Sequence, residues 1–174
     1  MREKPAAEKP AAVEGEQAVK EYQAKFNEWK ELIKELRAIK VKFQTAPDAE
    51  AADLRKKWEQ LMAQGETLIP QLRSLGSAAY VAQPNVDLGL ARFLVNMVED
   101  DIRSDRFEDA AALSKTLLDN QCELSEIYQL AGVAAFSLNQ FDQAEELFKK
   151  ADEANAFTNE LAKNQQLNNN LQAT

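Results

Sequence analysis

The sequence has no histidine, and Cys122 is the single cysteine among its 174 residues. Without histidine the chain lacks the commonest general base and the commonest metal ligand of proteins. One cysteine excludes an intramolecular disulfide and a multi-cysteine metal site, and the absence of a histidine base favours an inert thiol. We therefore expect no metal centre, no cofactor and no catalysis from this chain.

Glycine and proline are also scarce, with five residues of each, and no run of alternating β-branched residues is present. Alanine, leucine, glutamate, glutamine and lysine dominate instead, and all five are strong helix formers. No apolar stretch approaches the roughly 20 residues that span a bilayer. The composition predicts an all-α protein without a membrane-spanning segment.

The first residues of the chain lack the apolar core of a signal peptide. This feature favours a cytoplasmic protein. A chain from which the signal had been removed would look the same, and that protein would be exported. The sequence therefore leaves the compartment open.

The net charge of −8 is unevenly distributed along the chain. Residues 1–75 hold 14 basic and 13 acidic side chains, whereas residues 76–174 hold 7 basic and 16 acidic ones. Electrostatic repulsion by the second half disfavours nucleic acid and anionic membranes as partners. We therefore expect a protein or peptide partner.

An internal repeat is the clearest positive feature of the sequence. The run Phe-Glu-Asp-Ala at 107–110 aligns with Phe-Asp-Gln-Ala at 141–144. A period near 34 is typical of stacked helix–turn–helix units, each of which needs a neighbour to bury its apolar face. We expect two such units in residues 84–156, with Asn85 as the first N-cap, and a polar capping helix and tail in residues 157–174. Their helices are expected at 86–103, 107–118, 125–138 and 141–155.

Residues 16–75 carry two apolar seams with the alternating three- and four-residue spacing of packed helices. A short segment, 45–48, separates the seams and resembles a capping box, so the two helices should fold back as an antiparallel hairpin. Pro70 should kink or end the second helix near Leu68. The seams consist of Val19, Tyr22, Phe26, Trp29, Ile33, Leu36 and Phe43, and of Leu54, Trp58, Leu61, Leu68, Leu72 and Leu75.

The segments around the hairpin have a different composition. Residues 1–15 form a Lys/Pro/Ala quasi-repeat, which predicts a disordered linker, and residues 76–83 are expected to be a connector of small residues.

Trp29 and Trp58 lie on the seams, which favours core packing over ligand stacking. We predict that both tryptophans are buried in a monomeric hairpin that docks on the first repeat helix through Leu90, Phe93, Leu94 and Met97.

The segment 127–151 resembles a tetratricopeptide repeat. In this unit Ala156 stands where proline is usual. In the preceding unit Val98, Asp101 and Ser114 stand where glycine, tyrosine and phenylalanine are usual. The resemblance implies tetratricopeptide-like helix pairs that bind protein or peptide partners. The signature positions of the second unit are occupied by Tyr128, Ala131, Gly132, Ala144, Phe148 and Ala151.

A longer resemblance rests on the run Phe-Asn-Glu-Trp-Lys-Glu-Leu at 26–32 and on segments 100–110 and 130–136. Together they resemble the N-terminal helical part of bacterial multidomain cyclophilin-type peptidyl-prolyl cis-trans isomerases. In those proteins a catalytic β-barrel follows the helical part. Its arginine, glutamine and aromatic site residues have no counterparts here, so we expect isomerase activity from a larger parent polypeptide and not from this chain.

The densest group of carboxylates lies between residues 99 and 109. An EF-hand loop would need a central glycine, which is missing here, so the sequence favours a solvated acidic face over a calcium site. The carboxylates are Glu99, Asp100, Asp101, Asp105, Glu108 and Asp109.

A candidate peptide-binding face follows from the register of the repeat, because the first helix of each tetratricopeptide-like pair lines the concave side. Its mixed polar and apolar lining suits an extended peptide or a helix laid in the groove. The alternative is that this face packs on the hairpin. The candidate residues are Arg92, Val95, Asn96, Glu99, Arg103, Glu126, Gln129, Leu130 and Val133.

Two classes of function remain after these exclusions. The first is a non-catalytic interaction or spacer module that forms the N-terminal helical region of a larger isomerase polypeptide. The second is a stand-alone scaffold in which the hairpin is a homodimerisation device. A short turn closes a hairpin at little entropic cost and buries its seams within one chain, so we expect a monomer.

Overall fold

A computed structural model describes the backbone of residues 10–155 and the side chains of residues 15–155. This part of the chain contains six helices and no strand, which confirms the predicted all-α class. The chain forms two compact units, Met1–Gln83 and Pro84–Thr174, which we describe separately. The expected capping helix and tail, residues 157–174, lie outside the described residues.

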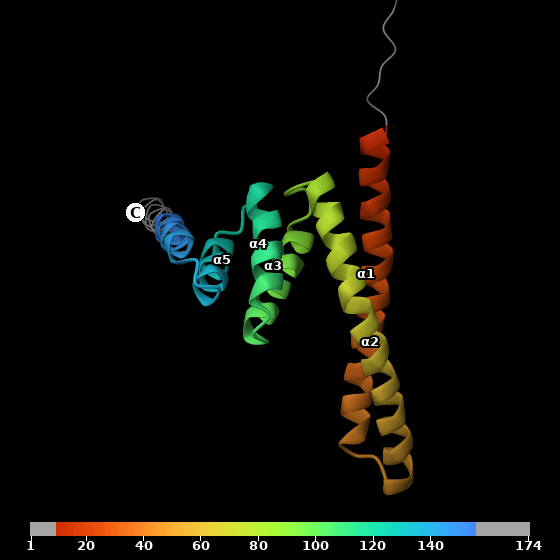
Figure 1. Ribbon diagram of the computed structural model, residues 1–174. Helices are drawn as coiled ribbons and strands as arrows, with labels where there is room; N and C mark the ends of the chain where they lie inside the picture. Colours follow the sequence, from red (N-terminus) through yellow and green to blue (C-terminus); the bar gives the residue numbers. More distant parts are fainter. Residues whose placement is uncertain (1–9, 156–174) are drawn as a thin grey trace, which may run out of the picture. The chain divides into compact units, whose positions relative to one another are not determined.

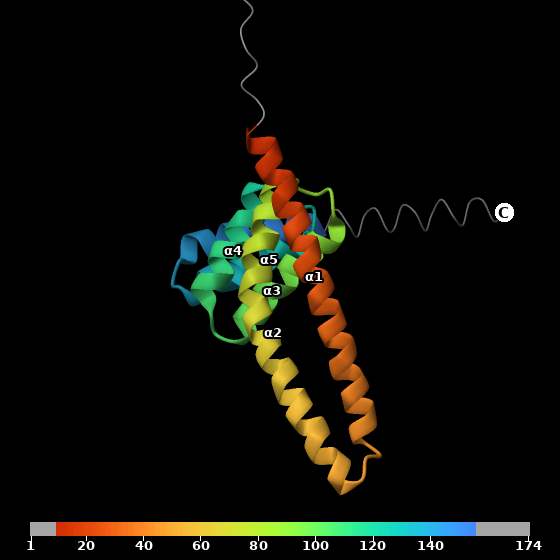
Figure 2. The same cartoon turned by 90° about the vertical axis from the view of Figure 1, so that its right-hand side faces the viewer.

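The first unit consists of helices α1 (Pro10–Phe43) and α2 (Asp48–Ala82), which lie side by side and run in opposite directions (Figures 1 and 2). Gly15 near the start of α1 faces Ala82 at the end of α2, and a Cβ atom on Gly15 would lie 2.9 Å from the Ala82 Cβ. Farther along, Gly65 faces the ring of Trp29, and Lys57 Nζ lies 3.0 Å from Glu35 Oε2. The two helices therefore pair over most of their length.

The buried cluster between α1 and α2 includes two residues of α1 that lie outside the predicted seam. Leu32 and Ile39 are among its most buried members, whereas Phe43 at the end of the seam is exposed. Trp29 and Trp58 are only partly buried, because two helices cannot cover so large a side chain on all sides. The cluster consists of Leu32, Leu36, Ile39, Leu61 and Leu68, with Trp29, Ile33, Leu54 and Trp58 packed against it.

The ends of these helices differ from the sequence predictions. The α1 helix begins at Pro10 and not at residue 16, since a proline in the first turn removes no helical hydrogen bond. The α2 helix continues through Pro70 to Ala82, so residues 76–82 are helical. Leu68 and Leu72 on either side of the proline are buried, and this packing maintains the helix. The expected capping box is absent, because Pro47 precedes α2 without a side-chain cap.

The second unit contains α3 (Leu88–Arg103), α4 (Phe107–Asp119), α5 (Glu126–Ser137) and a helix over residues 141–155. The α4 helix packs against both α3 and α5, and α3 also contacts α5. The α3, α4 and α5 helices begin and end within two residues of their predicted positions, and the last helix begins at the predicted residue 141.

Asn85 does not cap α3, contrary to the prediction. Asp87 is the N-cap, and its Oδ1 accepts hydrogen bonds from the backbone N–H groups of Gly89 (2.8 Å) and Leu90 (3.2 Å). Asn85 has a φ of 58° and points to the α4–α5 connection instead. Its Nδ2 donates to the Gln121 carbonyl at 2.8 Å, and its Oδ1 accepts from the backbone N–H of Glu123 at 3.3 Å. Asn85 therefore joins the start of α3 to the end of α4.

Three helices of this unit end in the same way, with a left-handed residue that is not glycine. Asp105, Gln121 and Asn139 have φ values of 56°, 55° and 60°. After each of them a backbone N–H bonds back to a carbonyl five residues earlier, as in a Schellman motif. Asp105 and Asn139 occupy equivalent positions of the repeat, and so do the helix starts at positions 107 and 141. The sequence repeat is therefore also a repeat of backbone conformation.

At two equivalent positions, the two helix pairs of the repeat carry their smaller and larger side chains on opposite helices. Gly132 lies against Phe148, and a Cβ atom on Gly132 would lie 2.6 Å from the Phe148 Cε1. The equivalent positions of the preceding pair hold Val98 and Ser114, both buried. A small residue on the first helix thus accompanies a large one on the second, and the reverse holds in the preceding pair.

We expect Gly132→Val to destabilise the protein by about 1–3 kcal/mol, because the new side chain overlaps the Phe148 ring. Adding Phe148→Ser recreates the combination at positions 98 and 114 and should recover at least about 1 kcal/mol relative to additive effects. Urea unfolding of the single and double variants measures both quantities. Ala112→Val, on an exposed face of α4, is the control and should stay within about 0.5 kcal/mol. Additive effects of the two substitutions would contradict the proposed contact.

Candidate functional site

The nine candidate residues of the peptide-binding face are not equally accessible. Arg92, Asn96, Arg103 and Gln129 are exposed. Val95 is the exception among the nine, because only 3% of its surface is exposed, so it cannot offer a side chain to a ligand. The residues that are partly exposed are Glu99, Glu126, Leu130 and Val133.

The accessible residues occupy one stripe on each of two neighbouring helices. On α3 they lie at positions 92, 96, 99 and 103, which are three or four residues apart and share a helix face. On α5 they lie at 126, 129, 130 and 133, where positions 129 and 130 are adjacent and each lies three or four residues from both 126 and 133, so this stripe is wider. An ion pair between Arg92 Nη1 and Glu126 Oε1 joins the two helices. Since these residues are equivalent in the register of the repeat, the pair places the two stripes next to each other.

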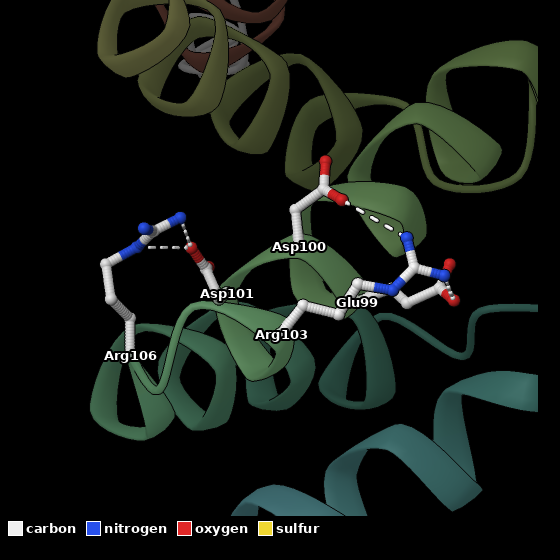
Figure 3. Close-up of polar contacts among 5 residues, drawn as sticks. All are labelled: Glu99, Asp100, Asp101, Arg103 and Arg106. Carbon is white, nitrogen blue, oxygen red and sulfur yellow. Dashed lines mark hydrogen bonds and ion pairs between the residues drawn. The ribbon is translucent and has the colours of Figure 1, made fainter.

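Charges on this surface are largely compensated. Arg92 pairs with Glu126, and Arg103 Nη2 lies 2.6 Å from Glu99 Oε1, with Asp100 Oδ1 3.7 Å from the other guanidinium nitrogen (Figure 3). Asn96 and Gln129 make no side-chain hydrogen bond within the described residues. The face therefore offers two amide groups, each able to donate and accept, and the apolar side chains of Leu130 and Val133.

Asp101 does not belong to a solvated acidic face, contrary to the sequence prediction. It is fully buried, whereas its neighbour Asp100 is exposed. The Nε and Nη2 atoms of Arg106 donate to Asp101 Oδ1 at 3.0 and 2.8 Å, as Figure 3 shows. The backbone N–H of Arg106 also donates to the Asp101 carbonyl at 2.8 Å. The pair fixes the turn between α3 and α4 because its two members lie on opposite sides of that turn.

The register of the repeat contains a signal for the burial of Asp101. Its equivalent in the second pair is Ala135, which is also buried. A carboxylate at a position where the repeat buries alanine needs a cationic partner, and Arg106 is the nearest cation on the far side of the turn. This equivalence did not enter the sequence prediction, because Asp101 lies within a run of acidic residues and was assigned to an exposed acidic face with them.

An exposed aromatic groove of about 350 Å³ lies between the end of α5 and the helix that begins at residue 141. Phe136 and Phe141, both more than half exposed, meet edge to face with ring centroids 5.5 Å apart. Glu145 and Lys149 also line this groove, and their side chains lie 2.5 Å apart. The hydrogen bond from Lys149, and then its charge, lower the pKa of the Glu145 carboxyl, and the same contact raises the pKa of Lys149.

Neither a metal-ligand cluster nor an accessible thiol occurs among the described residues. No cluster of three or more potential metal ligands occurs among them. The thiol of Cys122 is buried. None of the helices between residues 10 and 155 combines the length and apolarity that crossing a membrane requires.

We expect Asp101→Ala to lower the free energy of unfolding by about 1.5–3 kcal/mol, because it removes hydrogen bonds to a charged group and leaves Arg106 without this partner. Asp100→Ala is the matched control, since the same change one residue earlier affects an exposed side chain and should stay within about 0.5 kcal/mol. Denaturant unfolding compares the two. Equal effects of the two substitutions would show that the buried pair does not stabilise the turn.

Comparison of the chain with protein-family models, curated proteins and solved structures gives no match. The candidate site is therefore defined by its own geometry. It consists of two adjoining helix stripes with largely compensated charges, two amide groups that have no hydrogen-bond partner within residues 15–155, and a small apolar area.

Proposed function

We propose that this chain is a non-catalytic protein-interaction module, and that the adjoining stripes of α3 and α5 bind an extended segment of a partner protein. The ion pair between Arg92 and Glu126 carries this proposal, because it joins the two stripes into one surface and neutralises its charges. Asn96 and Gln129, about one turn after Arg92 and Glu126 on the same two helices, are exposed.

The chemistry of the surface favours a partner segment with little net charge. A primary amide side chain can donate to a backbone carbonyl and accept from a backbone N–H, so Asn96 and Gln129 suit an extended main chain. Leu130 and Val133 lie one turn apart on α5 and offer an apolar area for one side chain of the partner. We infer that main-chain hydrogen bonds supply affinity and that this apolar area supplies selectivity.

The tetratricopeptide-like assignment and the place in a larger isomerase polypeptide are part of the same proposal. Two features recur at equivalent positions of the repeat and support tetratricopeptide-like units: the helix starts, and the left-handed residues Asp105 and Asn139. An ion pair also joins the equivalent positions 92 and 126. The resemblance of segments 26–32, 100–110 and 130–136 supports the isomerase context.

The hairpin fits a spacer within this proposal. A helix of 34 residues, as in α1, is roughly 50 Å long at about 1.5 Å per residue. The cluster around Leu36 and Leu61 is buried between α1 and α2 of one chain, which favours a monomeric spacer over the alternative of a homodimerisation device.

Selection from a random peptide library on the immobilised full chain should enrich neutral peptides. Asn96→Leu/Gln129→Leu should weaken a selected peptide by about 30-fold, because two hydrogen bonds at about 1 kcal/mol each are lost. Fluorescence polarisation with the labelled peptide measures the affinities.

Gln60→Leu/Gln143→Leu is the matched control, because it replaces the same number of exposed amide groups elsewhere. It should leave the affinity within about twofold of the unchanged chain. An equal loss in both double variants would place the binding surface elsewhere. Failure of the library to yield any peptide above the bare support would refute the interaction function.

A further inference from the structure

A second surface, on the hairpin, has different chemistry from the stripes of α3 and α5. A groove of about 410 Å³ lies between the end of α1 and the start of α2. This volume falls in the range of about 300–1,000 Å³ that is typical of ligand pockets. The groove is lined by Ile39, Lys40, Phe43, Leu54, Arg55 and Trp58.

The groove combines an apolar lining with cations. Phe43 is half exposed and Trp58 partly exposed, so aromatic surface is accessible from solvent. Lys40 and Arg55 are exposed and make no ion pair within the described part of the chain. Residues 37–57 hold six basic and three acidic side chains, whereas residues 84–155 hold 6 basic and 15 acidic ones. The groove is therefore a locally basic region of an acidic protein.

Stabilisation of the helix dipole explains the positions of only some of these basic residues. Lys40 and Lys42 lie in the last turn of α1, where a positive charge interacts favourably with the helix dipole. Arg55 lies within the third turn of α2, where the dipole favours no cation, and yet it lines the same groove from the opposite helix. The two unpaired cations thus converge on one apolar groove.

We propose that this groove binds an acidic polypeptide segment, with an aromatic or aliphatic side chain of the partner inserted between α1 and α2. The apolar side chain would contact Phe43 and Trp58, and flanking carboxylates would pair with Lys40 and Arg55. Charge complementarity selects this partner and increases its rate of association. The site is independent of the proposed peptide-binding face on α3 and α5.

A polypeptide fits the groove better than an anionic membrane surface does. Asp48, Glu50 and Asp53 are exposed at the start of α2, next to the turn between the helices, and anionic headgroups would repel them. A partner segment can place its carboxylates beside Lys40 and Arg55 and avoid these acids. A concave groove also accepts a single protruding side chain, which a flat membrane surface does not provide.

The test uses a fluorescein-labelled hexapeptide in which two phenylalanines lie between pairs of glutamates. We expect saturable binding to the full chain, and a change in Trp58 emission in a Trp29→Phe background. Lys40→Glu/Arg55→Glu should weaken binding by about tenfold or more, and Phe43→Ser should also weaken it. Lys20→Glu/Lys34→Glu is the matched control, because it changes the net charge equally at exposed sites of α1 outside the groove.

Four results would overturn the proposal. They are undetectable binding of the hexapeptide, equal binding of a version with lysines in place of the glutamates, equal losses in the two charge-reversal variants, and binding only to vesicles of phosphatidylcholine and phosphatidylserine. Circular dichroism of each variant, with helix content equal to that of the unchanged chain, ensures that a loss of binding is not a loss of fold. Because none of these variants alters α3 or α5, the result is separate from the test of the peptide-binding face.

Discussion

The pairing of amphipathic helices along their length is the constraint on which both units of this protein depend. No strand or disulfide supplements the helices between residues 10 and 155, so each apolar stripe must be covered by another helix. In the first unit α1 and α2 cover each other, and burial of a leucine such as Leu36 contributes about 1.5–3 kcal/mol. In the second unit α4 contacts both α3 and α5.

Close approach of paired helices requires small residues at particular places. Gly15 faces Ala82, Gly65 faces Trp29, and Gly132 faces the ring of Phe148. At Gly15 and Gly132 a Cβ atom would overlap an atom of the partner helix, whereas at Gly65 it would lie 3.5 Å from the Trp29 ring, an ordinary contact distance. Two of the five glycines are therefore needed for close helix contact. The left-handed helix ends instead use Asp105, Gln121 and Asn139.

The distribution of charge gives the two candidate surfaces different preferences. On α3 and α5 each accessible cation of the stripes has a carboxylate partner, so the surface suits a neutral segment. At the hairpin groove Lys40 and Arg55 have no such partner among the residues that the structure describes, and the surface suits an acidic segment. A module with both surfaces could hold two different segments, which agrees with the proposed role in protein interaction.

The sequence alone determined the helical class, the period of the repeat and, to within two residues, the bounds of α3, α4 and α5. These features depend on local chemistry, namely helix propensity, apolar spacing and turn residues, which can be read from neighbouring positions. The stripes on α3 and α5 also followed from spacing, since residues three and four apart share a helix face.

Other features were decided by tertiary structure. The α2 helix passes through Pro70 because buried residues on both sides maintain it, and Asn85 bonds to a distant connection instead of capping α3. Asp101 is buried with Arg106, although its neighbours in the sequence indicated an exposed acidic face. Burial and partners of this kind depend on which surfaces meet in three dimensions, and local sequence patterns do not specify such contacts.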